Sequence, residues 1–70
     1  MLKNINYDLL ETITIISKSL YRYETYVKDC EGNKSCVEMW TKFKKNREKE
    51  LSLLLKELKN QIDTGIFPLE

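Results

Sequence analysis

The sequence predicts an all-α protein, an antiparallel two-helix hairpin that dimerises into a four-helix bundle. Three observations support this fold class. The chain has 70 residues, which is enough for one domain at most, and it contains only two glycines and one proline. Apolar residues also recur every three or four positions along two long segments, as they do on one face of a helix. We therefore expect residues 1–70 to form a single helical-hairpin domain.

The first helix is expected over about residues 6–29. Apolar side chains alternate there at spacings of four and three, which is typical of a helix that packs against another helix. These side chains are Leu9, Ile13, Ile16, Leu20, Tyr23 and Val27. The β-branched segment 12–16 alternates like a strand, but the longer helical pattern outweighs it.

A polar segment over residues 30–35 is expected to form the turn, because its Gly32-Asn33 pair readily adopts positive φ. Ser35 and Glu38 have the spacing of a capping box, which predicts a second helix over about residues 36–64. Gly65 should end that helix and leave a short tail, residues 65–70.

Dimerisation is expected because two helices that touch along one seam cannot bury much apolar surface. Further apolar side chains flank both seams, among them Leu10, Ile15, Leu53 and Leu55. A second copy of the chain would cover them in a two-fold symmetric bundle. The alternative is a monomeric hairpin held by its cysteines, with these side chains on its surface.

Cys30 and Cys36 lie at the two ends of the predicted turn, close enough in a hairpin for a disulfide. A redox switch is one functional interpretation, and a metal or iron–sulfur site built from the thiolates of two subunits is another. Their spacing matches no established zinc or thioredoxin pattern. A structural clasp, or two reduced thiols, is therefore favoured.

Seven consecutive polar residues, 44–50, interrupt the apolar pattern of the second helix. Some of them must face the first helix, so we expect a polar core layer of Glu24, Arg47 and Glu50, with Arg47 paired to Glu24. A carboxylate cluster of Glu24, Glu48 and Glu50 could instead bind metal ions in a ferritin-like bundle. Such bundles use Glu-x-x-His motifs, however, and this chain contains no histidine. We assign no metal ligand and no cofactor.

Two surfaces are candidates for binding other molecules. Near the turn, aromatic and sulfur-containing side chains form a possible protein-interaction surface: Tyr21, Tyr26, Met39 and Trp40. The second helix also carries basic residues beside Trp40 and Phe43, a composition suited to nucleic acid: Lys42, Lys44, Lys45, Arg47 and Lys49. A solvated basic face explains the latter set equally well.

Composition narrows the function classes. The absence of histidine excludes histidine-dependent catalysis, and a net charge of +1 makes neither nucleic acid nor an anionic membrane the default partner. No signal peptide or spanning segment is apparent, which favours the cytoplasm. We expect a non-enzymatic interaction or regulatory module that binds itself and another protein. The alternatives are a nucleic-acid-binding regulator and the metal-binding bundle.

Overall fold

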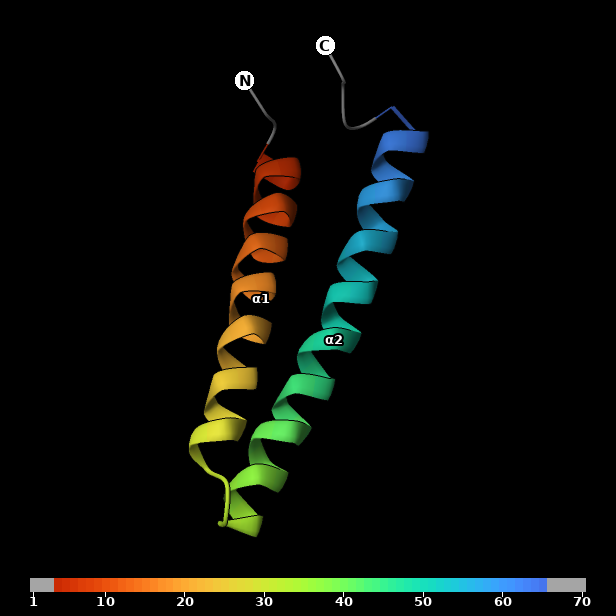
Figure 1. Ribbon diagram of the computed structural model, residues 1–70. Helices are drawn as coiled ribbons and strands as arrows, with labels where there is room; N and C mark the ends of the chain where they lie inside the picture. The colour runs from red at the N-terminus through yellow and green to blue at the C-terminus, as the bar shows by residue number, and fades with distance from the viewer. Residues whose placement is uncertain (1–3, 66–70) are drawn as a thin grey trace.

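The computed structural model describes residues 4–65, which form two α-helices joined by a tight turn (Figure 1). Helix α1 spans Asn4–Asp29 and helix α2 spans Lys34–Asp63. The helices run antiparallel and pack against each other along their length, so the predicted all-α helical hairpin is confirmed. The molecule is a rod with extents of 50 × 18 × 14 Å. The predicted tail lies outside the described residues except for Gly65.

The contact between the helices follows a seven-residue repeat. On each helix, two sets of positions spaced by seven face the partner helix, the pattern of a coiled coil. All of these positions are buried or half-buried. On α1 and the residue that follows it they are Asn6, Ile13, Leu20 and Val27 with Leu9, Ile16, Tyr23 and Cys30; on α2 they are Val37, Lys44, Leu51 and Leu58 with Trp40, Arg47, Leu54 and Gln61.

Helix α1 continues through the β-branched segment that alternates like a strand. The hydroxyls of Thr12 and Thr14 donate hydrogen bonds to the carbonyls of Asp8 and Leu10, at 2.7 and 3.0 Å. Each of these bonds spans four residues along the helix, so the polar groups of the threonines are satisfied without leaving helical geometry. The apolar spacing of three and four along α1 therefore predicts the structure of this segment better than its strand-like alternation does.

The expected capping box at the start of α2 is wrong. Asn33, not Ser35, caps the helix: its backbone is extended, with φ −113° and ψ 94°, and its Oδ1 accepts from the Cys36 amide at 3.2 Å. Ser35 already lies inside α2 and donates its hydroxyl to the same Oδ1 at 3.0 Å. The short amide of Asn33 reaches the third amide of the helix, as a good cap does, so α2 begins two residues earlier than expected.

Glycines stand at both ends of α2 where the backbone needs positive φ. Gly32, with φ 92°, reverses the chain in the turn. Gly65, with φ 80°, follows Thr64 at the other end of the helix, where the Gly65 amide donates to the carbonyl of Ile62 at 3.2 Å. Gly65 was expected to end α2, and its positive φ and this hydrogen bond explain how it does so.

Two links between the helices define their register. Cys30 and Cys36 are joined by a disulfide with Cα atoms 5.9 Å apart, and Lys44 Nζ lies 3.8 Å from Glu24 Oε1. Counting back from these links along both helices places Leu20 at the level of Arg47. The same count places Asn6 at the level of Gln61, at the end of the hairpin opposite the turn, which we call the open end.

The core of this hairpin is small. Among the described residues, the buried apolar side chains are Leu9 and Ile16, with exposed fractions of 8% and 6%. The other apolar residues of the repeat are half-buried, because each has a neighbouring helix on one side only. At the open end the most buried residues are polar: Asn6 is 0% exposed and Gln61 is 4% exposed.

Candidate interaction surface

Apolar side chains gather on one side of the hairpin toward the open end. On α2 they follow spacings of four, three and four, and on α1 a spacing of three, so each row lies along one helix face. In an antiparallel pair the equivalent flanks of the two helices lie on the same side of the seam, and the two rows therefore adjoin. We call this surface the apolar face; it consists of Leu10, Ile13, Leu51, Leu55, Leu58 and Ile62.

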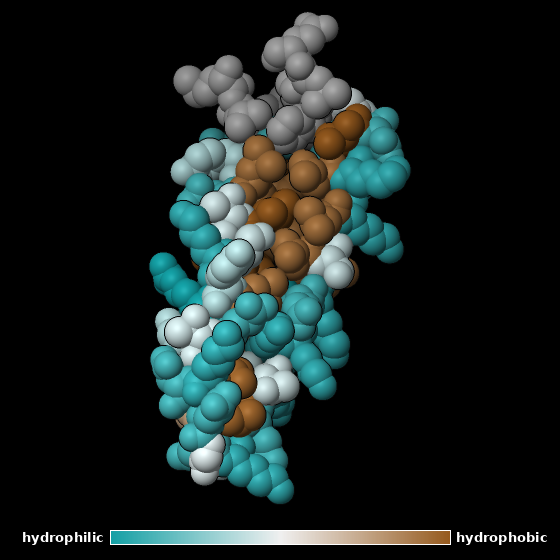
Figure 2. Space-filling view, viewed as in Figure 1, coloured by the Kyte–Doolittle hydropathy of each residue, from teal (hydrophilic) through white to brown (hydrophobic). Residues whose placement is uncertain are grey.

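The apolar face is accessible to solvent. Leu55 and Ile62 are 49% and 38% exposed, and the other four side chains are half-buried. Figure 2 shows brown side chains joined into one area across the upper halves of both helices, whereas teal side chains cover most of the lower halves. An exposed apolar area of this kind, rimmed by polar residues, is typical of a protein–protein contact.

A belt of charged side chains crosses the seam nearer the turn. We call it the polar belt; it comprises Glu24, Lys44, Arg47 and Glu50. Lys44 pairs with Glu24 across the seam at 3.8 Å, and Arg47 Nη1 donates to Glu50 Oε1 at 2.9 Å along α2. Arg47 Nε is buried and has no hydrogen-bond partner. The seam thus contains a cationic side chain that is only partly satisfied.

The expected pairing of Arg47 with Glu24 is wrong, although both residues belong to the belt. Arg47 on α2 lies level with Leu20 on α1. Glu24 is one helical turn closer to the loop than Leu20, so it lies level with the α2 residue that is one turn closer to the loop than Arg47. That residue is Lys44, which was expected only as part of the basic surface. Its position in the belt follows from its spacing of seven residues before Leu51.

Two shallow hollows lie next to each other on the same side of the hairpin as the apolar face, but at the turn end. One, of about 310 Å³, is lined by Val27, Thr41, Lys44 and neighbouring charged residues of α1. The other, of about 290 Å³, lies along α2 and shares Thr41. Their rims are charged: Glu24, Lys28, Glu38, Lys42, Lys44 and Lys45. This half of the surface is therefore hydrophilic where the open-end half is apolar.

Four aromatic rings join the helices at the turn end. Trp40 of α2 has its ring centroid 4.8 Å from that of Tyr26 and 5.6 Å from that of Tyr23, and Phe43 meets Trp40 edge-on at 5.7 Å. Such tilted and edge-to-face arrangements are favourable for aromatic pairs. Most of this aromatic surface is therefore used within the hairpin.

The structure brings together only part of the predicted protein-interaction surface. Tyr26 and Trp40 pack on each other and are half-buried, and Met39 is 42% exposed one residue before Trp40. Tyr21 is 80% exposed and takes no part in the ring contacts of the described residues. Five residues separate it from Tyr26, which turns the two side chains toward different sides of α1.

The candidate nucleic-acid residues do not form one surface. Lys42, Lys45 and Lys49 are exposed, whereas Lys44 and Arg47 occupy seam positions and pair with glutamates of the polar belt. The two sets occupy different positions of the seven-residue repeat and therefore different sides of α2. Lys44 and Arg47 face α1, whereas Lys42 and Lys49 lie on the outer side of α2. Of the five basic residues, only Lys42, Lys45 and Lys49 are exposed and could contact nucleic acid.

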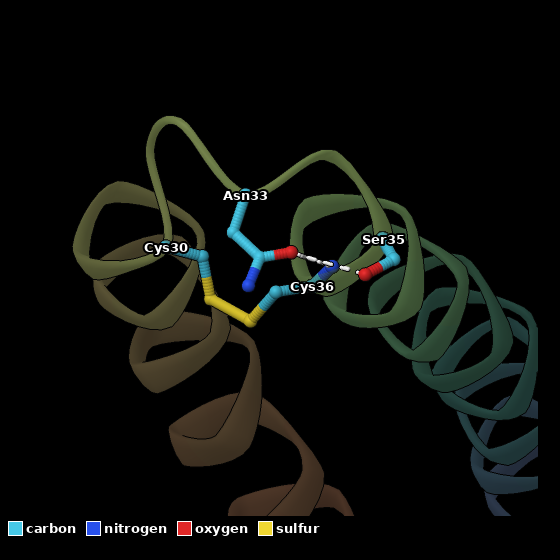
Figure 3. Close-up of a disulfide and its surroundings, with 4 residues drawn as sticks. All are labelled: Cys30, Asn33, Ser35 and Cys36. Carbon is cyan, nitrogen blue, oxygen red and sulfur yellow. Dashed lines mark hydrogen bonds between the residues drawn. A yellow bond between two sulfur atoms is a disulfide. The ribbon is translucent and has the colours of Figure 1, made fainter.

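The cysteine pair closes the turn (Figure 3). Cys30 directly follows α1, and Cys36 lies in the first turn of α2, where its amide donates to the capping Asn33. The disulfide and the cap thus hold the same short segment from two sides. Among the described residues, no three histidine, cysteine, aspartate or glutamate side chains lie close enough together to hold a metal ion.

The buried amides at the open end, Asn6 and Gln61, were not recognised as seam residues in the sequence. Their signal is the seven-residue spacing: Asn6 precedes Ile13 by seven, and Gln61 follows Leu54 by seven. The Oε1 atom of Gln61 is buried without a hydrogen-bond partner, while its Nε2 lies 3.5 Å from Glu57 Oε1.

No protein-family model matches the chain, and no curated protein or solved structure is significantly similar to it. Within residues 4–65, neither helix is long and apolar enough to cross a membrane.

Proposed function

We propose that this protein is a non-enzymatic protein–protein interaction module that acts as a homodimer, with the apolar face as its dimer contact. The observation that carries the proposal is the small core: two buried apolar side chains among the described residues, beside an apolar face whose side chains are exposed or half-buried. Helix faces that are covered on one side only are completed by further helices, and a second copy of this hairpin would complete a four-helix bundle.

The accessible surface supports the same proposal. The chain exposes 5631 Å², whereas a compact monomer of 8.4 kDa exposes about 4,600 Å². The excess is about 1,000 Å², and a stable interface of ordinary size covers about 800 Å² on each partner. Pairing two copies through one face each would bring the exposed area per chain close to that of a compact protein.

The aromatic cluster at the turn end is the surface we propose for another protein. Met39 is 42% exposed and Phe43 is 40% exposed, beside the half-buried rings of Tyr26 and Trp40. Methionine and aromatic side chains are enriched at the centres of interfaces. A homodimer would present this surface twice, once on each hairpin.

Sedimentation equilibrium at several protein concentrations tests the dimer and its face together. We expect the wild-type chain to approach twice 8.4 kDa as its concentration rises. Leu55→Glu places a charge in the apolar face and should shift the equilibrium to monomer. Leu53→Glu is the matched control, because Leu53 lies on the same helix and is 68% exposed, yet belongs to the opposite flank.

A wild-type chain that stays monomeric at all concentrations would overturn the proposed homodimer. Equal dissociation of the two variants would overturn the assignment of the face, since Leu53 and Leu55 would then contribute alike.

The disulfide bears on where the protein acts. Disulfides persist in oxidising compartments and are rare in the cytosol, outside hyperthermophiles. We propose the cytoplasm as the location, in which case the Cys30 and Cys36 thiols should be reduced in the cell. Rapid acid quenching followed by alkylation of free thiols and mass analysis distinguishes the two states. A chain that resists alkylation until it is reduced would place the protein in an oxidising compartment instead.

A further inference from the structure

We infer that the two copies of the chain overlap only through their open-end halves, in antiparallel orientation, so that the two turn ends point away from each other. This inference rests on the proposed homodimer and specifies its arrangement. Its basis is the uneven distribution of apolar and charged side chains along the side of the hairpin that carries the apolar face.

The second copy is the occupant that fits the apolar face. The excess of exposed surface, about 1,000 Å², is the amount that one partner covers in an interface of ordinary size. The face is also self-complementary in chemistry, because two copies would meet leucine and isoleucine on both sides. A two-fold axis through the face would then build a four-helix core.

The same side of the hairpin changes character along its length. The open-end half presents the apolar face, and the turn-end half presents the charged rims of the two hollows. Thr41 and Leu55 make this contrast clear: they are fourteen residues apart on α2, occupy the same position of the seven-residue repeat, and lie on the same side. Glu38, Lys44 and Lys45 line the hollows beside Thr41. Leu55 instead has Leu51 and Leu58 as its neighbours along the apolar face.

Full antiparallel overlap conflicts with this distribution. It would place the turn-end half of one copy over the open-end half of the other, so that Lys28, Lys45 and Glu38 would lie against leucines. Removing these charges from water without new partners is strongly unfavourable.

Full parallel overlap conflicts with it as well. A two-fold axis along the rod would set each charged rim opposite its own copy. The charged side chains of both turn-end halves, Lys28 and Lys45 among them, would then be withdrawn from water, which is unfavourable unless each of them finds a partner of opposite charge. Overlap of the open-end halves alone buries the apolar face and leaves every charged rim in solvent.

The arrangement has a predictable length. The apolar face runs from Leu10 to Ile13 on α1 and from Leu51 to Ile62 on α2, and with the first turns of α1 it occupies a little under half of each helix. Two rods of 50 Å that overlap over about half of that length give a dimer of about 75 Å. Full overlap in either orientation gives about 50 Å, the length of one hairpin.

Small-angle X-ray scattering on the dimer separates these arrangements. We expect a maximum dimension of about 75 Å. A dimer of about 50 Å would overturn the half-overlap arrangement and leave the homodimer standing. A monomer at the concentrations used would overturn both, so the two proposals fail in different ways.

A matched pair of variants provides an independent readout from sedimentation equilibrium. Leu55→Glu should weaken dimerisation by about tenfold or more, because the new charge lies inside the contact. Thr41→Glu, at the same position of the repeat in the other half, should change the dissociation constant by less than about twofold, as expected for a site away from the interface. Strong weakening by Thr41→Glu would show that the turn-end half is also covered, and would overturn the inference.

Discussion

Tyr26 of α1 and Trp40 of α2 place their ring centroids 4.8 Å apart, with their planes inclined by 49°. This contact lies one turn of helix from the Cys30–Cys36 disulfide, so a covalent and a non-covalent link hold the helices together at the same end of the hairpin. Toward the open end the links are leucine and isoleucine contacts, interrupted by the polar belt.

Replacing Trp40 with alanine should lower the free energy of unfolding by about 2–3 kcal/mol, because it removes the ring that Tyr23, Tyr26 and Phe43 share. Urea unfolding followed by circular dichroism at a fixed protein concentration measures the change. Tyr21→Ala is the control: Tyr21 is 80% exposed, and its loss should change the stability by less than about 0.5 kcal/mol. Equal effects of the two variants would contradict the packing role of Trp40.

Removing the disulfide should lower the free energy of unfolding by about 2 kcal/mol, the chain-entropy value for so short a closed loop. The double variant Cys30→Ser/Cys36→Ser and the chemically reduced wild-type chain should unfold at the same urea concentration. The reductant should have no effect on the double variant. If reduction left wild-type stability unchanged, the disulfide would not contribute to holding the turn.

Asn33→Ala should cost about 1 kcal/mol, because the Cys36 amide loses the side-chain oxygen that caps α2. Asn33→Asp, which keeps an acceptor at the same place, should retain most of the stability. Ser52→Ala, on the exposed surface of α2, serves as a neutral reference. If the Asn33→Ala variant were as stable as the Ser52→Ala variant, the prediction would be contradicted, and another group would have to cap the helix.

Arg47→Met should raise the stability of the hairpin by roughly 1–2 kcal/mol, because an apolar side chain of similar length replaces a seam cation whose Nε lacks a partner. Lys49→Met, on the exposed outer side of α2, should have little effect. Thermal unfolding of both variants beside the wild type measures the difference. A destabilised Arg47→Met chain would show that the Arg47–Glu50 pair contributes more than it costs.

Much of the fold could be predicted from the sequence, because the seven-residue repeat from Leu9 to Val27 is strong and local. The cap of α2 could not, since Asn33 and Ser35 are both good capping residues and only the backbone angles of Asn33 decide between them. The ion-pair partner of Glu24 could not be predicted either, because it depends on the register between the two helices. The helical pattern alone leaves that register uncertain by about one turn, the distance between Lys44 and Arg47.

The candidate surface was predictable in part. Leu10 and Leu55 were recognised as apolar residues beyond the seam, but their union into one face requires knowing that equivalent flanks of antiparallel helices lie on the same side. Apolar periodicity does not reveal the seam positions of Asn6 and Gln61, because both side chains are polar. Polar residues at seam positions are identified only when the seven-residue spacing is extended beyond the apolar residues.

The position of the turn also bears on the order in which this hairpin is expected to fold. Cys30 and Cys36 are six residues apart, whereas Asn6 and Gln61, level with each other at the open end, are separated by most of the chain. Because the entropy lost on closing a loop grows with its length, we expect helix pairing to start beside the turn and to proceed toward the open end. The segment that pairs last is the one that carries the apolar face. If the proposed homodimer forms, amide hydrogen exchange at the open end should slow as protein concentration rises, because association would hold closed the part of the hairpin that opens most readily.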